Sequence, residues 1–125
     1  MEVGETAEAA VRREVKEELG ITVDSVEFLN WADAVNPDFF HKQAHFIFFD
    51  FAARHAAGEV TVDQNEIHEY AWVEPAKALA TLKIDSFTGR AIEIFIQRGK
   101  EKDLLAECEE YKTGWQRALA DYQNL

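Results

Sequence analysis

The chain has 125 residues, a length typical of one domain with one core and one principal site. Hydrophobic residues make up 47% of the sequence and aromatic residues 12%, and this composition excludes disorder of the whole chain. Lys and Arg number 13 against 24 Asp and Glu, so the formal net charge is −11. That charge argues against a nucleic acid polymer as partner, because such binding depends on cationic side chains.

The cysteine content and the hydropathy pattern favour a cytoplasmic location. Cys108 is the only cysteine, so an intrachain disulfide is excluded and the thiol is expected to be inert. No segment approaches the ~20 consecutive apolar residues that span a membrane, so no membrane partner is expected. The acidic residue directly after Met1 argues against a signal peptide.

The N-terminal third of the chain predicts a helix followed by a strand. A helix is expected over residues 6–19, because Thr6 is a suitable N-cap and apolar residues recur at every fourth position. Gly20 can take the left-handed conformation that ends such a helix. The β-branched and aromatic residues of 21–34 then predict a strand.

The middle of the chain predicts further strands and a short helix. The nearly continuous apolar run 45–53 is typical of a central strand covered on both faces. After a glycine-containing turn, residues 60–62 predict another strand, and so does the aromatic and β-branched segment 70–73. Pro75 suits the first turn of a short helix that continues over 76–80.

The C-terminal part is predicted to be helical. Asp85 or Ser86 can cap a helix that ends at Gly99, and the tail 100–125 predicts one or two more helices with a break near 113–114. A helix followed by strands and then helices indicates an α+β or mixed α/β fold with a sheet between helical layers.

Three glutamates are expected on one face of the first helix. Glu14, Glu17 and Glu18 are related as i, i+3 and i+4, which brings their side chains together. Their mutual repulsion would be reversed by a divalent cation, and carboxylate oxygens are the ligands that Mg²⁺ and Mn²⁺ prefer. The alternative is a glutamate-rich helix face that is simply solvated.

These glutamates lie in a longer motif that resembles the Nudix box. The box consists of Gly, five residues, Glu, seven residues, and then Arg-Glu-hydrophobic-x-Glu-Glu-x-Gly-hydrophobic. In this chain Glu5 is followed, seven residues later, by the segment Arg13-Glu14-Val15-Lys16-Glu17-Glu18-Leu19-Gly20-Ile21. Every element matches except the opening Gly, which would fall two positions before Met1. The match has several residues at fixed spacing and is therefore specific.

The resemblance implies a fold and a reaction. It implies a Nudix-type α/β/α sandwich with a mixed sheet, from which the strands that precede the box are missing. Residues 1–125 would form one domain, with the box at 1–21, a core that extends to about residue 97 and a helical tail over 100–125. The implied activity is a Mg²⁺-dependent pyrophosphohydrolase, with Mn²⁺ as a substitute, that cleaves a nucleoside diphosphate linked to another moiety. The alternative is a non-catalytic Nudix-like module that binds a nucleotide or a protein.

The resemblance also implies roles for the residues of the box. Glu17 and Glu18 would be the principal metal ligands, and Glu14 a further ligand or the base that activates water. Arg13 would belong to the catalytic residues together with these glutamates. Arg13 and Glu5 would orient the carboxylates of the helix. Gly4 and Gly20 would supply backbone geometry that a Cβ would obstruct.

A carboxylate outside the box often completes the metal site of this family. Glu66 and Glu69 are the candidates, and in a strand they would point to opposite faces. We favour Glu66, because it can lie in the turn before the strand, where a ligand can adjust as substrate enters.

Substrate contacts and assembly are less well defined by the sequence. Residues that could contact phosphate are His41, Lys42 and His45, and aromatic residues that could stack on a base are Trp31, Phe39, Phe40 and Trp72. For each of them a role in the core or on the surface is the alternative. Without strands before the box the sheet would have an exposed edge, and a homodimer with the tail packed across it is expected.

Overall fold

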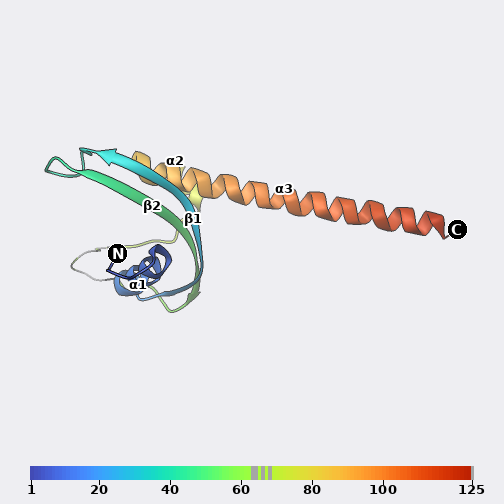
Figure 1. Cartoon of the computed structure of the whole chain (residues 1–125), viewed down its shortest axis with the longest axis horizontal. Helices are drawn as coiled ribbons and strands as arrows, with labels where there is room; N and C mark the ends of the chain where they lie inside the picture. Colours follow the sequence, from blue (N-terminus) through green and yellow to red (C-terminus); the bar gives the residue numbers. More distant parts are fainter. Residues whose placement is uncertain (63–64, 66, 68, 125) are drawn as a thin grey trace.

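The computed structural model describes residues 1–62, 65, 67 and 69–124 of the chain (Figure 1). The elements in chain order are α1 (Ala7–Leu19), β1 (Thr22–Val35), β2 (His45–Ala57), α2 (Pro75–Thr81) and α3 (Ser86–Gln123). The α+β class predicted from the sequence is confirmed. Within the described residues no helix is long and apolar enough to cross a membrane.

The first helix begins and ends as its sequence predicts. Thr6 is the N-cap of α1, and its hydroxyl oxygen accepts a hydrogen bond of 3.1 Å from the backbone N–H of Ala9. Gly20 takes the left-handed conformation with φ 72°, and its N–H donates to the carbonyl of Lys16 at 3.0 Å. Local side-chain and backbone chemistry therefore fixes both ends of the helix.

The sheet is a long antiparallel hairpin of β1 and β2. The pairing runs from Thr22 opposite Ala57 to Val35 opposite His45, with register shifts near Val23 and Phe28. Figure 1 shows that the hairpin curves strongly, with α1 lying near the end where β1 begins and β2 ends. The described part of the chain thus contains two antiparallel strands, where the family resemblance implies a larger mixed sheet.

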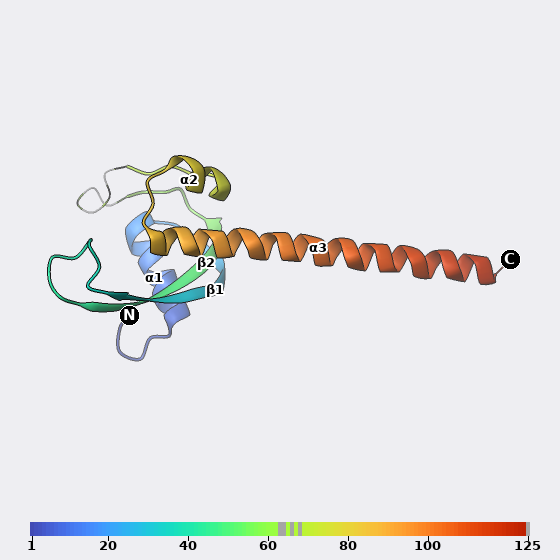
Figure 2. The same ribbon diagram turned by 90° about the horizontal axis from the view of Figure 1, so that it is seen from above.

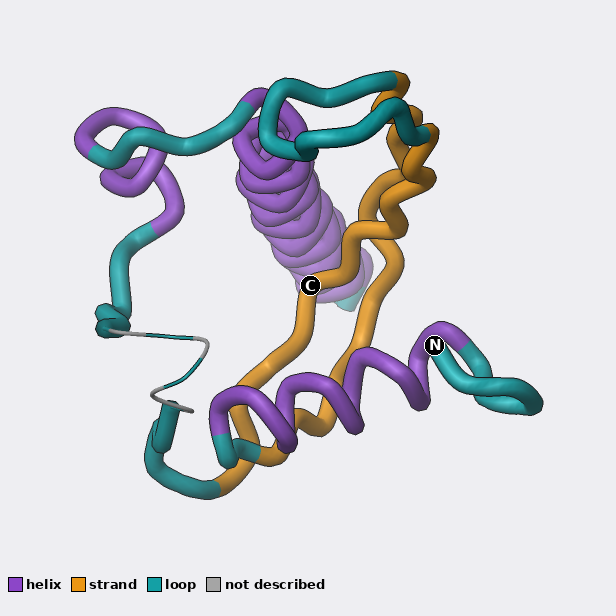
Figure 3. Tube along the Cα trace, turned by 90° about the vertical axis from the view of Figure 1, so that its left-hand side faces the viewer, coloured by secondary structure: helices purple, strands orange, loops and turns teal. Residues whose placement is uncertain are grey.

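One face of the hairpin packs against α3 through a cluster of aromatic rings. Phe46 and Phe48 of β2 are stacked with their centroids 6.0 Å apart, and Phe48 lies 5.7 Å from Phe87 at the start of α3. Phe39, from the loop between the strands, lies 6.1 Å from Phe48 and closes the cluster. Figures 2 and 3 show α3 between the hairpin and α2, so the helical layer lies on this side of the sheet.

The opposite face of the hairpin is exposed along its outer half. Trp31 and Phe49 are cross-strand partners on this face, and their exposed fractions are 56% and 59%. Ile47, two residues from Phe49, is 55% exposed. The prediction that 45–53 forms a central strand covered on both faces is therefore wrong for the described chain. Its alternating burial is that of a strand covered on one face.

Two other predicted strands are also absent from the structure. Residues 60–62 and 70–73 are irregular, although their composition suits a strand. Neither segment has a partner strand in the described part of the chain, and β-branched and aromatic residues form a sheet only where a partner is present. The short helix is confirmed, since α2 begins with Pro75 at its first turn as predicted.

The C-terminal part is a single helix of 38 residues. Asp85 is its N-cap, as predicted, with a side-chain oxygen that accepts from the N–H of Thr88 at 2.9 Å. The predicted end at Gly99 and the predicted break near 113–114 are both wrong, because α3 continues through these positions. Neither Gly99 nor Gly114 has a positive φ, so neither adopts the left-handed conformation with which a glycine ends a helix.

The face of the hairpin that packs on α3 contains one unusual carboxylate. Asp50 lies opposite Asn30, and its Oδ2 atom is buried without a hydrogen-bond partner among the described residues. Burial, followed by the charge of Asp85, raises the pKa of Asp50 above its ordinary value of 3.8. The Asp50 carboxyl therefore binds its proton more tightly in the folded state than in the unfolded state. Its contribution to stability is lost as the pH rises above the ordinary pKa of 3.8 and through the higher folded-state pKa.

We expect Asp50→Asn to stabilise the protein at neutral pH. The amide carries no charge to desolvate or to repel Asp85, so the free energy of unfolding at pH 7 should rise by up to about 1 kcal/mol. Well below pH 3.8, where the acid is protonated in both states, the gain should disappear. Urea denaturation at the two pH values measures both effects. Asp38→Asn, at an exposed loop position, is the matched control. A pH-independent difference would contradict the assignment.

Candidate functional site

The three predicted glutamates lie together on the exposed side of α1. Glu14, Glu17 and Glu18 are all exposed, and their positions in the helix fall within little more than one turn. The structure therefore gives this surface three carboxylates that solvent and ligands can reach.

Arg13 connects these carboxylates to the segment before the helix. Its Nε and Nη2 atoms donate to the two carboxylate oxygens of Glu5 at 2.8 and 3.1 Å, a bidentate pair. The third nitrogen, Nη1, donates to Glu17 at 3.0 Å, and Nη2 lies 3.7 Å from an oxygen of Glu14. One guanidinium thus contacts three of the four glutamates that belong to the motif.

Glu5 is the best-shielded member of this group. Its side chain is 14% exposed, whereas that of Glu17 is 62% exposed. The hydrogen bonds from Arg13 lower the pKa of Glu5 to about 2, with a further contribution from the backbone N–H of Glu2, which donates at 2.9 Å. The same pair raises the pKa of Arg13. Glu5 and Arg13 are therefore both ionised at neutral pH, where their ion pair is fully formed.

Gly4 belongs to the same turn and is selected by its backbone conformation. Its φ is +82°, a value that L side chains rarely adopt, and a Cβ built there would have no heavy atom within 4 Å. Strain in the backbone, and not lack of space, is thus the reason for glycine at this position. The turn brings Glu2 and Glu5 together through a hydrogen bond of 3.1 Å from the N–H of Glu5 to the carbonyl of Glu2.

The donors on α1 have the chemistry that a hard divalent cation needs. Glu18 has neither a hydrogen bond nor an ion pair in the described chain, and Glu17 has one oxygen engaged by Arg13. However, no three carboxylate, imidazole or thiol groups of the described residues are gathered closely enough to hold a metal ion in this conformation. Glu66 lies outside the described residues, and Glu69 is exposed.

A cavity of about 590 Å³ opens near the C-terminal end of α1. Its lining residues are His55, Gly58, Glu59, Val60, Tyr70 and Trp72. Gly58 connects it to the helix, because a Cβ built there would lie 3.1 Å from the carbonyl oxygen of Gly20. The ring of His55 lies 5.8 Å from that of Trp72, centroid to centroid, and its Nε2 atom donates a hydrogen bond of 2.7 Å to the carbonyl of Gly58.

The sequence predicts no cavity here, and of its lining residues only Trp72 is among the four aromatic candidates for stacking on a base. His55 and Tyr70 are not among the predicted contacts. The available signal was the shared parity of Tyr70 and Trp72 in a segment that follows the candidate carboxylates. His55 is brought to the cavity by the end of β2, which no local pattern indicates.

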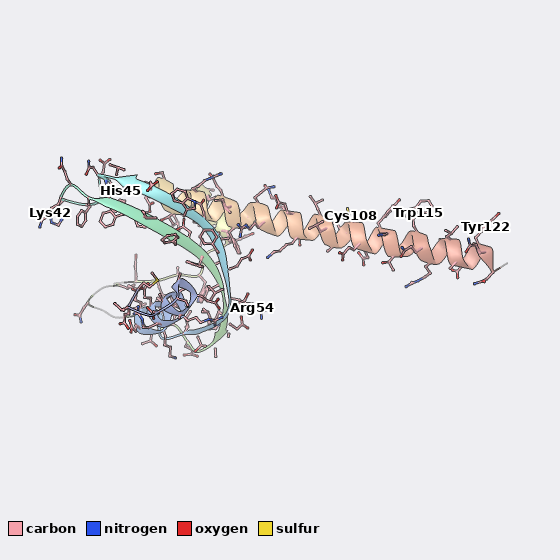
Figure 4. All side chains as sticks on the ribbon, viewed as in Figure 1. Lys42, His45, Arg54, Cys108, Trp115 and Tyr122 are labelled. Carbon is pink, nitrogen blue, oxygen red and sulfur yellow. The ribbon has the colours of Figure 1, made fainter. Side chains whose placement is uncertain are left out.

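The other candidate contacts lie away from this region. Lys42 and His45 lie at the tip of the hairpin, at the end opposite Arg54, which pairs with Asp24 near α1 (Figure 4). His45 instead contacts Asp33 across the strands at 2.7 Å. Three further candidates are placed in the same half of the hairpin: His41 and Phe40 in the loop at its tip, and Trp31 on the open face of the sheet.

Comparison with known proteins identifies the family. A family model described as a NUDIX domain matches residues 1–95, which include the whole of α1 and the hairpin. The chain belongs to the Nudix family. Its Nudix box is the segment that Arg13 organises, and the match ends within the first third of α3.

Two relatives of this chain have names that state an activity. The NAD-capped RNA hydrolase NudC of Pasteurella multocida is 34% identical over 99 residues, which cover 70% of this chain and 34% of that protein. The protein of the same name from Haemophilus influenzae is 37% identical over 75 residues, or 58% of this chain and 25% of that protein. The chain therefore spans between a quarter and a third of these relatives.

The ion pair between Glu5 and Arg13 makes a prediction about acid stability. The folded-state pKa of Glu5, about 2, lies below its ordinary value of 4.5, so the pair stabilises the protein above pH 4.5 and this stabilisation is lost as the pH falls toward 2. Glu5→Gln should lower the free energy of unfolding at pH 7 and should flatten its dependence on pH in that window.

Urea denaturation at several pH values between 2 and 7 measures this effect. Glu18→Gln is the matched control, because it removes a carboxylate from the same motif without breaking an ion pair of the described structure. Identical pH profiles for Glu5→Gln and the wild-type protein would contradict the role of the pair.

Proposed function

We propose that this chain is a divalent-cation-dependent pyrophosphohydrolase that cleaves a nucleoside diphosphate linked to another moiety. The observation that carries the proposal is the Nudix box in its folded form, in which Arg13 is anchored by Glu5 while the carboxylates of α1 face solvent. Membership of the Nudix family and the hydrolase names of the relatives support it.

Each residue of the box has a proposed role. Glu17 and Glu18 would bind Mg²⁺ or Mn²⁺, with Glu14 as a further ligand or as the base that takes a proton from the attacking water. When bound, the cation supplies neutralisation of the charge that develops on the phosphate oxygens. Arg13 would orient Glu17 through their hydrogen bond of 3.0 Å, and Glu5 would hold Arg13 in place.

The cavity lined by His55, Tyr70 and Trp72 is the proposed site for the nucleotide base. It contains two exposed aromatic rings, with Tyr70 54% and Trp72 71% exposed, and stacking on such rings does not require one particular base. Its position beside Gly20 would place a base at one end of the helix that carries the carboxylates.

The names of the relatives suggest a first substrate class to test. Both are hydrolases of NAD-capped RNA, so a dinucleotide pyrophosphate such as NAD is a candidate, alone or at the end of an RNA. A net charge of −11 favours the small molecule over the polymer. Turnover of NAD, ADP-ribose, a nucleotide sugar and NAD-capped RNA, with Mg²⁺ or Mn²⁺, would identify the class from the phosphate products.

The alternative of a binding module without turnover has one supporting observation. The carboxylates of the described residues are not gathered around a common point, and Arg13 occupies one oxygen of Glu17. Nucleotide binding without product in every combination of substrate and cation would favour that alternative.

A cytoplasmic location is also part of the proposal, supported by the free, exposed thiol of Cys108.

Glu18→Gln should abolish most of the activity and weaken cation binding. Removal of a principal ligand is expected to lower kcat by about 100-fold or more, while the fold is retained because Glu18 is exposed. Mn²⁺ titration followed by electron paramagnetic resonance gives a second measurement that does not require turnover. Glu8→Gln is the matched control on the same helix and should leave both unchanged. Wild-type turnover by Glu18→Gln at saturating Mg²⁺ would disprove the ligand assignment.

The carboxylate from outside the box can be identified by two parallel substitutions. Glu66→Gln should raise the Mg²⁺ concentration required for half-maximal activity more than Glu69→Gln does, because Glu66 is the proposed further ligand. A magnesium titration of each variant measures the shift. An equal and negligible effect of both would mean that the box glutamates, water and substrate complete the coordination alone.

A further inference from the structure

The second half of α3 extends away from the rest of the protein. Figures 1 and 2 show the helix leaving the hairpin and continuing as an isolated rod to the C-terminus. Every residue from 99 to 124 is exposed. Lys102, which pairs with Glu27 of β1 at 3.1 Å, marks the end of the part that contacts the body. Two interior glycines, Gly99 and Gly114, each disfavour the helix by about 1 kcal/mol.

The part of α3 beyond Lys102, residues 103–123, is called the free half of α3 below. It carries an apolar stripe with the spacing of a coiled coil. The stripe is formed by residues at alternating intervals of four and three: Leu104, Cys108, Tyr111, Trp115, Ala118 and Tyr122. Alternation of four and three is the heptad repeat, with a at 108, 115 and 122 and d at 104, 111 and 118. Three large members of the stripe are 65–74% exposed: Tyr111, Trp115 and Tyr122.

We propose that the free half of α3 pairs with the same segment of a second copy in a parallel two-stranded coiled coil. The stripe would then be buried between the two helices, and each copy would contribute an identical surface around a two-fold axis. The proposal concerns residues 104–122 and does not depend on the proposed hydrolase activity.

The charges beside the stripe favour the parallel direction. Glu107 is at a g position and Lys112 at the e position five residues later, so a parallel pair places Glu107 of each copy next to Lys112 of the other. An antiparallel pair that keeps the same apolar layers would centre on Thr113. It would bring the two copies of Lys112 together and would place Glu107 next to Asp121. Attraction in one direction and repulsion in the other select the parallel arrangement.

The shape of the helix surface also suits a partner helix. A shallow depression, largely open to solvent, lies at Gly114 and is lined by Glu107, Glu110, Tyr111, Gly114, Trp115 and Ala118. The absent side chain of Gly114 and the small Ala118 leave room beside Trp115, whose ring lies 6.3 Å from that of Tyr111. Large residues next to small ones are what knobs-into-holes packing requires when an aromatic residue occupies the interface.

Sedimentation equilibrium of the full chain tests the dimer. At high micromolar concentration the wild-type protein should have twice the chain mass of 14.3 kDa. Trp115→Glu should weaken the dimer by at least about 30-fold, the effect of losing a buried aromatic anchor. Gln116→Glu is the matched control, because it adds the same charge one residue away at an outward position. A monomeric wild-type protein, or equal effects of the two variants, would overturn the proposal.

Two further experiments test the direction of pairing. In the parallel arrangement Cys108 of one copy faces Cys108 of the other, so a short bismaleimide should link the two chains. In the antiparallel arrangement the two thiols would be about 15 Å apart along the axis, which is ten residues of helix and beyond the reach of a short cross-linker.

The charges beside the stripe give a second test. Lys112→Glu should weaken the dimer, and the exchange of both charges in E107K/K112E should restore it. A dimer sensitive to Trp115→Glu but without the Cys108 cross-link would overturn the parallel coiled coil and indicate another contact, such as the helix against the open sheet face.

Discussion

Arg12 of α1 and Arg98 of α3 both donate hydrogen bonds to backbone carbonyls of β1, and this pair of contacts fixes the two helices to a single strand. Arg12 donates to the carbonyls of Val23 and Asp24 at 2.6 and 2.9 Å. Arg98 donates to the carbonyls of Phe28 and Leu29, the latter at 3.1 Å. Such charge-assisted hydrogen bonds are stronger than neutral ones, and β1 pairs with no strand of the described chain other than β2. The arginines therefore satisfy carbonyls of a strand that has one open side.

The attachment to β1 determines where the carboxylates of α1 and the C-terminal half of α3 lie. Because Arg12 points toward the strand, Glu14, Glu17 and Glu18 fall on the opposite side of α1 and remain exposed. Arg98 holds the first part of α3 in the same way, and Lys102 one turn later makes its ion pair with Glu27. Beyond this point the helix no longer contacts the sheet, so its apolar stripe stays in solvent. The contacts with β1 thus determine both the exposure of the carboxylates on α1 and the point at which α3 leaves the sheet.

The sequence allowed the helix ends to be predicted better than the sheet. Caps such as Thr6 and Asp85 depend on an oxygen that reaches an N–H three residues away, and Pro75 acts through its own ring, so local residues suffice. Residues 60–62 and 70–73 have strand composition but no partner, which only the tertiary fold decides. The sequence predicts a helix end at Gly99 and a break near 113–114, yet a glycine favours a helix end through a positive φ, which neither Gly99 nor Gly114 adopts.

The candidate site shows the same division between local and distant information. The spacing of Glu14, Glu17 and Glu18 requires only a helix, so their common face followed from the sequence. The cavity joins His55 at the end of β2 to Trp72 beyond the loop, and no local pattern links residues that far apart. The contacts of Arg13 required both the helix and the turn at Gly4, which the resemblance indicated and the residues alone did not.

The two partners of Arg13 have different exposures, and this difference bears on how the carboxylate face could accept a cation. Glu5 holds the guanidinium by two short hydrogen bonds and is 14% exposed, whereas Glu17 makes one and is 62% exposed. A cation that approaches α1 would compete with Arg13 for Glu17, where solvent screening makes the ion pair weak, and not for Glu5. Arg13 would then keep its position through Glu5 while Glu17 is released to the metal. The shielded pair with Glu5 would hold Arg13 in place, and the exposed pair with Glu17 would offset the repulsion among the glutamates until a ligand replaces it.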